Sequence, residues 1–98
     1  MMKDFVYCGE LLNIYRNLLS ETNQKYYSLY YEENLSLQEI ADLGHVSKSY
    51  VGNIISKTSQ KLLDYEDKLH LYEKSQKLYQ VLKMQDIKQI KNIVKEVL

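Results

Sequence analysis

The chain has 98 residues, with 45% hydrophobic and 27% charged residues, which suits one folded domain over residues 1–98 with a single modest core. Its 13 Lys and Arg balance its 13 Asp and Glu, which argues against indiscriminate coating of nucleic acid. Without a bilayer-length apolar run, a signal-like start or more than one cysteine, the sequence predicts a cytoplasmic protein with no membrane span and no internal disulfide.

Two helices are predicted in the first third of the chain. Apolar residues recur at three- and four-residue steps over about Asp4–Leu19, which indicates a helix with one apolar face. Ser20 is a suitable N-cap and Glu21 is favourable in a first helical turn. A second helix is therefore expected over about Glu21–Glu33, and the pattern then breaks.

A pair of helices joined by a tight turn is predicted next. Ser36 followed three residues later by Glu39 is a capping box, which opens a short helix over about Leu37–Leu43. Gly44 and His45 form the turn, and Ser47 caps the following helix. The spacing of small and apolar residues across this segment is typical of a helix-turn-helix over about residues 36–59. The turn usually carries glycine where His45 stands, and histidine tolerates the left-handed conformation better than most residues.

The helix that begins at Ser47 has no obvious stop before about Leu82, so it is predicted to be the longest of five helices. At 1.5 Å per residue it would be roughly 50 Å long, which exceeds the diameter of a domain of this size. Its far apolar stripe therefore needs a cover, and a homodimer interface is predicted at Leu62, Tyr65, Leu69, Tyr72 and Tyr79. The alternative is that a C-terminal helix over about Gln85–Val97 folds back onto this stripe.

Residues 11–79 resemble the YlxM-like family of bacterial helix-turn-helix proteins. The resemblance lies in Leu18-Leu19-Ser20, Tyr26-Tyr27-Ser28-Leu29-Tyr30-Tyr31, Ser36-Leu37-Gln38-Glu39-Ile40-Ala41, Val46-Ser47 and Tyr65-Glu66-Asp67-Lys68-Leu69-His70-Leu71-Tyr72-Glu73-Lys74. The last stretch is specific, because a generic helix-turn-helix has no reason to contain it. The resemblance implies an all-α bundle like the fourth region of bacterial sigma factors, and a homodimer. Because the family's genes lie beside those for the signal recognition particle GTPase and its receptor, it also implies a regulatory or accessory role in that pathway.

The candidate contacts to nucleic acid lie at the start of the long helix. The segment Leu43–Leu63 contains no acidic residue but contains three lysines, which makes a local positive strip. The residues predicted to contact DNA or RNA are Lys48, Ser49, Tyr50, Asn53 and Lys57. Asn53 is the residue suited to reading a base edge. A plain solvated helix face is the alternative interpretation of the same strip.

Three functions remain open from the sequence: a nucleic-acid-binding regulator, a module that docks on signal recognition particle proteins without binding DNA, and a binder of signal recognition particle RNA. The tyrosines could stack on unpaired bases but more often fill cores or interfaces at this spacing. Two interpretations fit the C-terminal lysines, which are Lys77, Lys83, Lys88, Lys91 and Lys95. They form a basic tail that binds RNA or lipid headgroups, or they line the solvent-facing side of an amphipathic helix. His45 and His70 lack ligand-spaced neighbours and Cys8 lacks a catalytic context, so no metal, cofactor or catalytic residue is expected and the protein is predicted not to be an enzyme.

Overall fold

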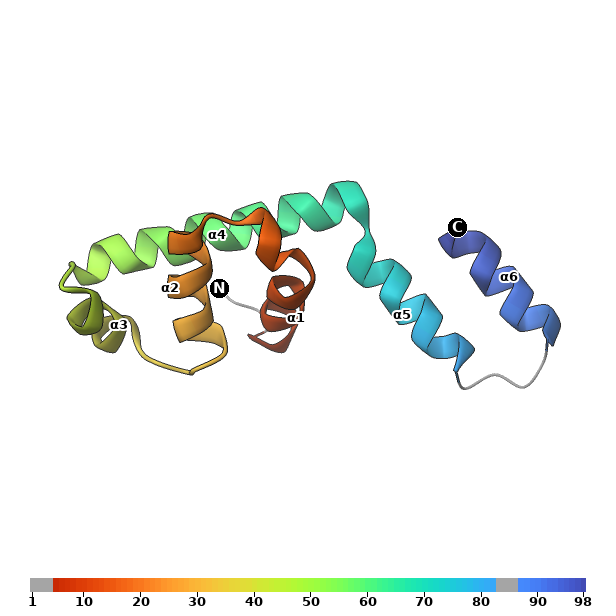
Figure 1. Ribbon diagram of the computed structural model, residues 1–98, viewed down its shortest axis with the longest axis horizontal. Coiled ribbons are helices and arrows are strands. Elements are labelled where there is room, and N and C mark those ends of the chain that lie inside the picture. Colours follow the sequence, from red (N-terminus) through yellow and green to blue (C-terminus); the bar gives the residue numbers. More distant parts are fainter. Residues whose placement is uncertain (1–4, 83–86) are drawn as a thin grey trace.

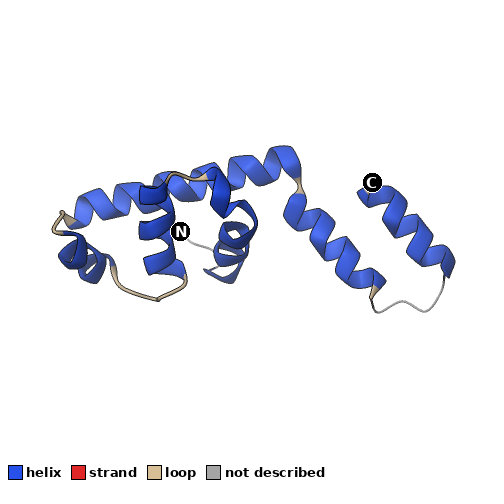
Figure 2. Ribbon diagram, viewed as in Figure 1, coloured by secondary structure: helices blue, strands red, loops and turns tan. Residues whose placement is uncertain are grey.

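The computed structural model describes residues 5–82 and 87–98, and every regular element within them is helical (Figures 1 and 2). The elements are α1 (Phe5–Tyr15), the short 3-10 helix η1 (Arg16–Leu18), α2 (Glu21–Tyr31), α3 (Leu37–Gly44), α4 (Lys48–Leu69), α5 (Leu71–Val81) and α6 (Ile87–Val97). The predicted all-α helix-turn-helix fold is thus confirmed. Three parts of the sequence predictions lie outside the described residues, namely the helix starts at Asp4 and Gln85 and the side chain of Lys83.

The molecule is elongated, with extents of 56 × 22 × 22 Å. Helices α1, α2 and α3 pack along one side of α4, while α5 turns away from the end of α4 and α6 returns beside α5 (Figure 1). None of the helices in the described part of the chain is long and apolar enough to cross a membrane. The structure therefore consists of a helical body, formed by α1 to α4, and an arm, formed by α5 and α6.

Serine side chains begin three of the helices, as the sequence predicts. The Ser20 hydroxyl accepts a hydrogen bond from the Asn23 backbone amide and starts α2. Ser36 and Glu39 form the complete capping box of α3, with both reciprocal hydrogen bonds present. The Ser47 hydroxyl accepts from the Tyr50 amide and starts α4. Each bond satisfies an amide that a helix N-terminus would otherwise leave without a partner.

The core lies between α4 and the three helices beside it. One face of α4 is buried throughout the body through Val51, Ile55, Thr58 and Leu62. The other buried apolar side chains come from the preceding helices and the segment after η1; they are Leu11, Leu12, Tyr15, Leu19, Tyr27, Tyr31, Ile40 and Ala41. Three of these are tyrosines, and the Tyr27 hydroxyl reaches Ser59 Oγ at 2.7 Å. Tyrosine rings, which can be buried when the hydroxyl has a hydrogen-bond partner, therefore make up much of the core of this small body.

The prediction of one continuous helix over residues 47–82 is wrong at one residue. His70 adopts a left-handed conformation, with φ of 54° and ψ of 33°, and it separates α4 from α5. The same kind of conformation, at φ 55°, occurs at His45, in the turn whose shape the sequence left open. No proline or glycine marks the break at His70, so the cause lies in contacts with α1 that are described below.

The break changes how the predicted dimer stripe is covered. Leu62 is only 1% exposed and belongs to the core of its own chain. The Tyr65 ring packs at 5.7 Å from the Tyr15 ring, and the Tyr72 ring meets Tyr7 edge-on at 5.0 Å. Leu69 and Tyr79 remain 44% and 61% exposed. Three of the five stripe residues are thus covered within one chain, two of them by tyrosines of α1.

Candidate nucleic-acid interface

Helices α3 and α4 meet at a tight turn that fixes their relative orientation. The His45 amide donates to the carbonyl oxygens of Ala41 and Asp42, and the Val46 amide donates to Ala41 at 3.0 Å. These bonds satisfy the last carbonyls of α3 and reverse the chain into the cap of α4. Ala41 is fully buried under α4, where a larger side chain would separate the two helices.

A tyrosine from α2 packs against Gly44, which stands one position before the usual turn glycine. A Cβ atom placed on Gly44 would lie 2.7 Å from the hydroxyl oxygen of Tyr26, so the end of the Tyr26 side chain would have to shift to make room for it. The Tyr26 ring also meets the Tyr50 ring edge-on, with centroids 6.1 Å apart. Tyr26 therefore braces both the end of α3 and the start of α4.

All five predicted contact residues are exposed on the first half of α4: Lys48, Ser49, Tyr50, Asn53 and Lys57. Ser49, Asn53 and Lys57 follow one another at four-residue steps, on the side of the helix opposite the buried Val51 and Ile55. Tyr50 flanks this row and is 46% exposed, while Lys48 is the first residue of the helix. The outward face therefore presents an ammonium group, an amide and a hydroxyl on a rigid helix, and a second ammonium group, that of Lys48, stands at the start of the helix.

The outward face extends one turn further than the sequence prediction. Ser56 and Gln60 are exposed on the same side of α4 as Asn53. The Gln60 amide donates to Asp64 at 3.0 Å, which marks the point where acidic side chains begin. The helical period already contained this signal, because Gln60 lies seven residues beyond Asn53 and so returns to the same face.

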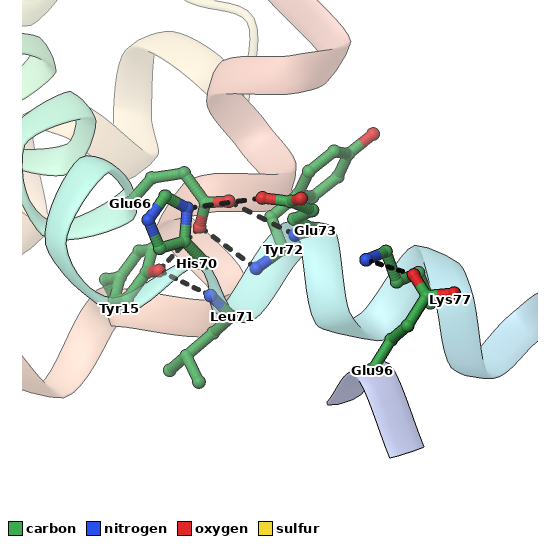
Figure 3. A network of polar contacts seen from close by, with 8 residues as sticks. All are labelled: Tyr15, Glu66, His70, Leu71, Tyr72, Glu73, Lys77 and Glu96. Atoms are coloured by element: carbon green, nitrogen blue, oxygen red, sulfur yellow. Dashed lines mark hydrogen bonds and ion pairs between the residues drawn. The ribbon is translucent and has the colours of Figure 1, made fainter. Parts of the chain in front are cut away.

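A network of hydrogen bonds at the break between α4 and α5 holds the arm against the body (Figure 3). Glu66 Oε1 accepts from the Tyr15 hydroxyl at 2.6 Å and from the Tyr72 amide at 2.9 Å, and Glu66 Oε2 accepts from the Glu73 amide at 3.1 Å. The Tyr15 hydroxyl in turn accepts from the Leu71 amide at 3.1 Å. We call this junction the elbow. Glu66 and Tyr15 together satisfy the first three amides of α5, the work that an N-cap side chain ordinarily does.

The elbow also accounts for the specific stretch Tyr65–Lys74 in the sequence. Glu66 supplies the capping carboxylate and His70 the left-handed residue, and the His70 ring pairs with Glu73 at 3.2 Å. Burial, together with the hydrogen bond to Glu66, raises the pKa of Tyr15 to about 12. Burial likewise raises the pKa of Tyr7, with the Glu66 charge adding to it.

Comparison with known proteins places this architecture in a family. The family described as "Putative helix-turn-helix protein, YlxM / p13 like", UPF0122, matches residues 2–97. The chain belongs to this family. The resemblance found in the sequence is thereby confirmed, and the description is that of a helix-turn-helix family rather than an enzyme family.

Members of the UPF0122 family in several bacteria are similar to this chain. A UPF0122 protein of Mycoplasma capricolum is 43% identical over 82 residues, covering 84% of this chain and 73% of that protein. A UPF0122 protein of Ureaplasma urealyticum is 37% identical over 91 residues, covering 89% and 92%. A UPF0122 protein of Clostridium acetobutylicum is 35% identical over 95 residues, covering 97% and 80%. The family match over residues 2–97 includes the arm, so the arm is part of what this chain shares with the family.

Proposed function

We propose that this UPF0122 protein is a non-enzymatic regulator that binds double-stranded DNA, with the first half of α4 as its recognition helix. The observation that carries the proposal is the row Ser49, Asn53 and Lys57, which is exposed on α4 while the opposite face is locked into the body. The major groove of B-form DNA admits an α-helix, whereas the deep major groove of an RNA helix does not. The geometry therefore favours DNA over RNA as the ligand.

The residues on this face have different roles in the proposal. Lys48 and Lys57 contact backbone phosphates, which position the helix without reading sequence. Asn53, near the centre of the row, reads a base edge, for which an asparagine amide pairs best with adenine. Ser49 and Tyr50, at the N-terminal end, donate hydroxyl groups to phosphate or base.

Fluorescence anisotropy with labelled duplexes of random and selected sequence tests the proposal. Lys48→Ala and Lys57→Ala are each expected to weaken binding to every sequence and to lower the salt slope by about 1. Asn53→Ala is expected to cost about 1–3 kcal/mol at one preferred base only. Lys25→Ala, on the exposed surface of α2, is the control and should leave binding unchanged. If the three α4 variants all bind as the native chain does, the protein-interaction alternative replaces this one.

The pathway is part of the same proposal. The YlxM-like resemblance implies regulation of signal recognition particle targeting, which takes place in the cytoplasm. Purified signal recognition particle GTPase from the same organism, mixed with this protein and its duplex, is expected to form a complex in gel filtration. Separate elution of the two proteins, with and without DNA, would remove the pathway from the proposal.

We also propose a homodimer that forms through the arm. Its support is the exposed apolar surface that α1 leaves uncovered: Leu69, Leu71, Leu78 and Tyr79 are between 42% and 61% exposed. Apolar patches of this kind are rarely left in water, and a two-fold pair is the commonest oligomer. Sedimentation equilibrium at tens of micromolar is expected to give twice the chain mass, and Leu69→Asp to give the monomer mass. A monomer mass for the native chain would contradict the dimer.

A further inference from the structure

Helix α6 carries a second basic surface, far along the chain from the recognition helix. Lys88, Lys91 and Lys95 follow one another at three- and four-residue steps, so they lie on one side of the helix, which we call the α6 lysine face. All three are exposed. Residues 75–98 contain five lysines and two acidic residues, a net charge of 5 − 2 = +3 in a chain whose total is zero.

The opposite side of α6 is occupied by α5, which turns the lysines outward. Ile90, Ile93, Val94 and Val97 are half-buried, and α6 runs beside α5 along the arm (Figure 1). Lys77 Nζ, from the middle of α5, donates to Glu96 Oε1 at 2.8 Å and ties the end of α6 to α5 (Figure 3).

This ion pair also matters for the charge of the face. Glu96 is the only acidic residue within α6, and its carboxylate is engaged by Lys77 on the α5 side. The helix therefore offers no carboxylate of its own that would neutralise Lys91 and Lys95.

We propose that the α6 lysine face is a second binding surface for the phosphodiester backbone of a nucleic-acid duplex. The inference rests on the proposed function and deepens it, because it adds contacts that position the protein without reading bases. A lipid surface is the less suitable ligand, since a helix lying in a membrane interface must bury its own apolar face there, and α5 already covers that face of α6.

The expected effect follows from counterion release. Each phosphate neutralised by a lysine adds about 0.9 to the slope of log affinity against log salt on B-form DNA. Replacing Lys91 and Lys95 together should therefore lower the slope by about 1.8, so that the ratio of native to variant affinity shrinks roughly twelvefold between about 50 mM and about 200 mM salt.

The test compares four forms of the full chain by anisotropy with labelled DNA and RNA duplexes of about 30 base pairs across that salt range. They are the native protein, Lys91→Gln/Lys95→Gln, the recognition-helix variant Lys48→Gln/Lys57→Gln, and the charge-matched control Lys25→Gln/Lys68→Gln. The control lysines are exposed on α2 and at the end of α4. Circular dichroism melting should be the same for all four, because each change is on the surface.

The proposal predicts that the α6 variant loses affinity and slope while the control keeps both; the duplex that shows the larger loss identifies the backbone that α6 contacts. If the α6 variant behaves like the control while Lys48→Gln/Lys57→Gln is weakened, this inference is overturned and the proposed function stands. If the native chain binds neither duplex at low salt, both this inference and the proposed DNA-binding function are overturned. The last measurement uses vesicles of phosphatidylcholine with one-third phosphatidylserine. If the α6 variant loses vesicle binding but keeps its duplex affinity, the α6 lysine face binds lipid and the inference is overturned.

Discussion

Replacing Glu66 by alanine should destabilise the protein by removing the acceptor at the centre of the elbow. Three hydrogen bonds end on this carboxylate, from the Tyr15 hydroxyl and from the amides of Tyr72 and Glu73. The variant leaves the two amides at the start of α5 without a protein acceptor. It also leaves the hydroxyl of Tyr15, a side chain only 1% exposed, without its acceptor.

The size of the effect follows from the parts that are lost. An N-cap acceptor contributes about 1 kcal/mol to the free energy of unfolding. A hydrogen bond to a charged group that is shielded from water contributes about 1.5–3 kcal/mol. Because Glu66 is half-exposed, water can replace part of this, and we expect a loss of about 2 kcal/mol in the free energy of unfolding. For a domain of this size, that loss lowers the melting temperature by roughly 8–16 °C.

Urea unfolding followed by circular dichroism measures this difference. Glu66→Gln keeps an acceptor oxygen and should lose roughly half as much. Asp67→Ala, at the exposed neighbouring position, is the matched control and should stay within about 0.5 kcal/mol of the native chain. In a double-mutant cycle with Tyr15→Phe, the two losses should add to more than the double variant shows, since both remove the same bond. A Glu66→Ala protein as stable as the Asp67→Ala control would refute this account of the break.

Three further predictions concern the buried tyrosines, the turn and the core. Burial raises the pKa of Tyr15 to about 12 and also raises the pKa values of Tyr7, Tyr27 and Tyr31. The folded state therefore holds these protons more tightly than the unfolded chain, so urea midpoints should be steady up to about pH 10 and fall as the pH rises towards about 12, and Tyr15→Phe should reduce that fall. His45→Gly should stabilise the protein by about 0.5–1 kcal/mol in thermal unfolding, because His45 is exposed at φ 55° and glycine adopts that conformation without strain; a lower melting temperature would contradict this. Thr58→Val should be neutral or stabilise by about 1 kcal/mol in urea unfolding, since the Thr58 hydroxyl is buried with no hydrogen-bond partner among the described residues, and a clear loss would point to a partner.

The parts of the fold that depend on neighbouring residues could be predicted from the sequence. The caps at Ser20, Ser36 and Ser47 are local, because each serine bonds an amide three residues ahead. The buried stripe of α4 follows from its helical period. The break at His70 could not be predicted in this way, since it is stabilised by Tyr15, which is 51 residues from its partner Glu66.

The candidate site also has features that the local sequence predicts and features that depend on contacts between distant residues. The exposure of Ser49, Asn53 and Lys57 follows from the period that buries Val51 and Ile55. The place of Gly44 does not, because it is the packing of Tyr26 from α2 against the turn that favours a residue without a Cβ there. The break at His70 and the glycine at position 44 thus both depend on contacts with tyrosines of other helices.

We propose that the first half of α4 enters the groove of a DNA duplex. Titration of unlabelled duplex into nitrogen-15-labelled protein, followed by amide chemical shifts, tests it most directly. The largest changes are expected on residues 47–60, with smaller changes on α6 and little change on α1. A titration in which the amides of Ser49, Asn53 and Lys57 stay unshifted while the duplex binds, or in which no amide moves at low salt, would contradict it.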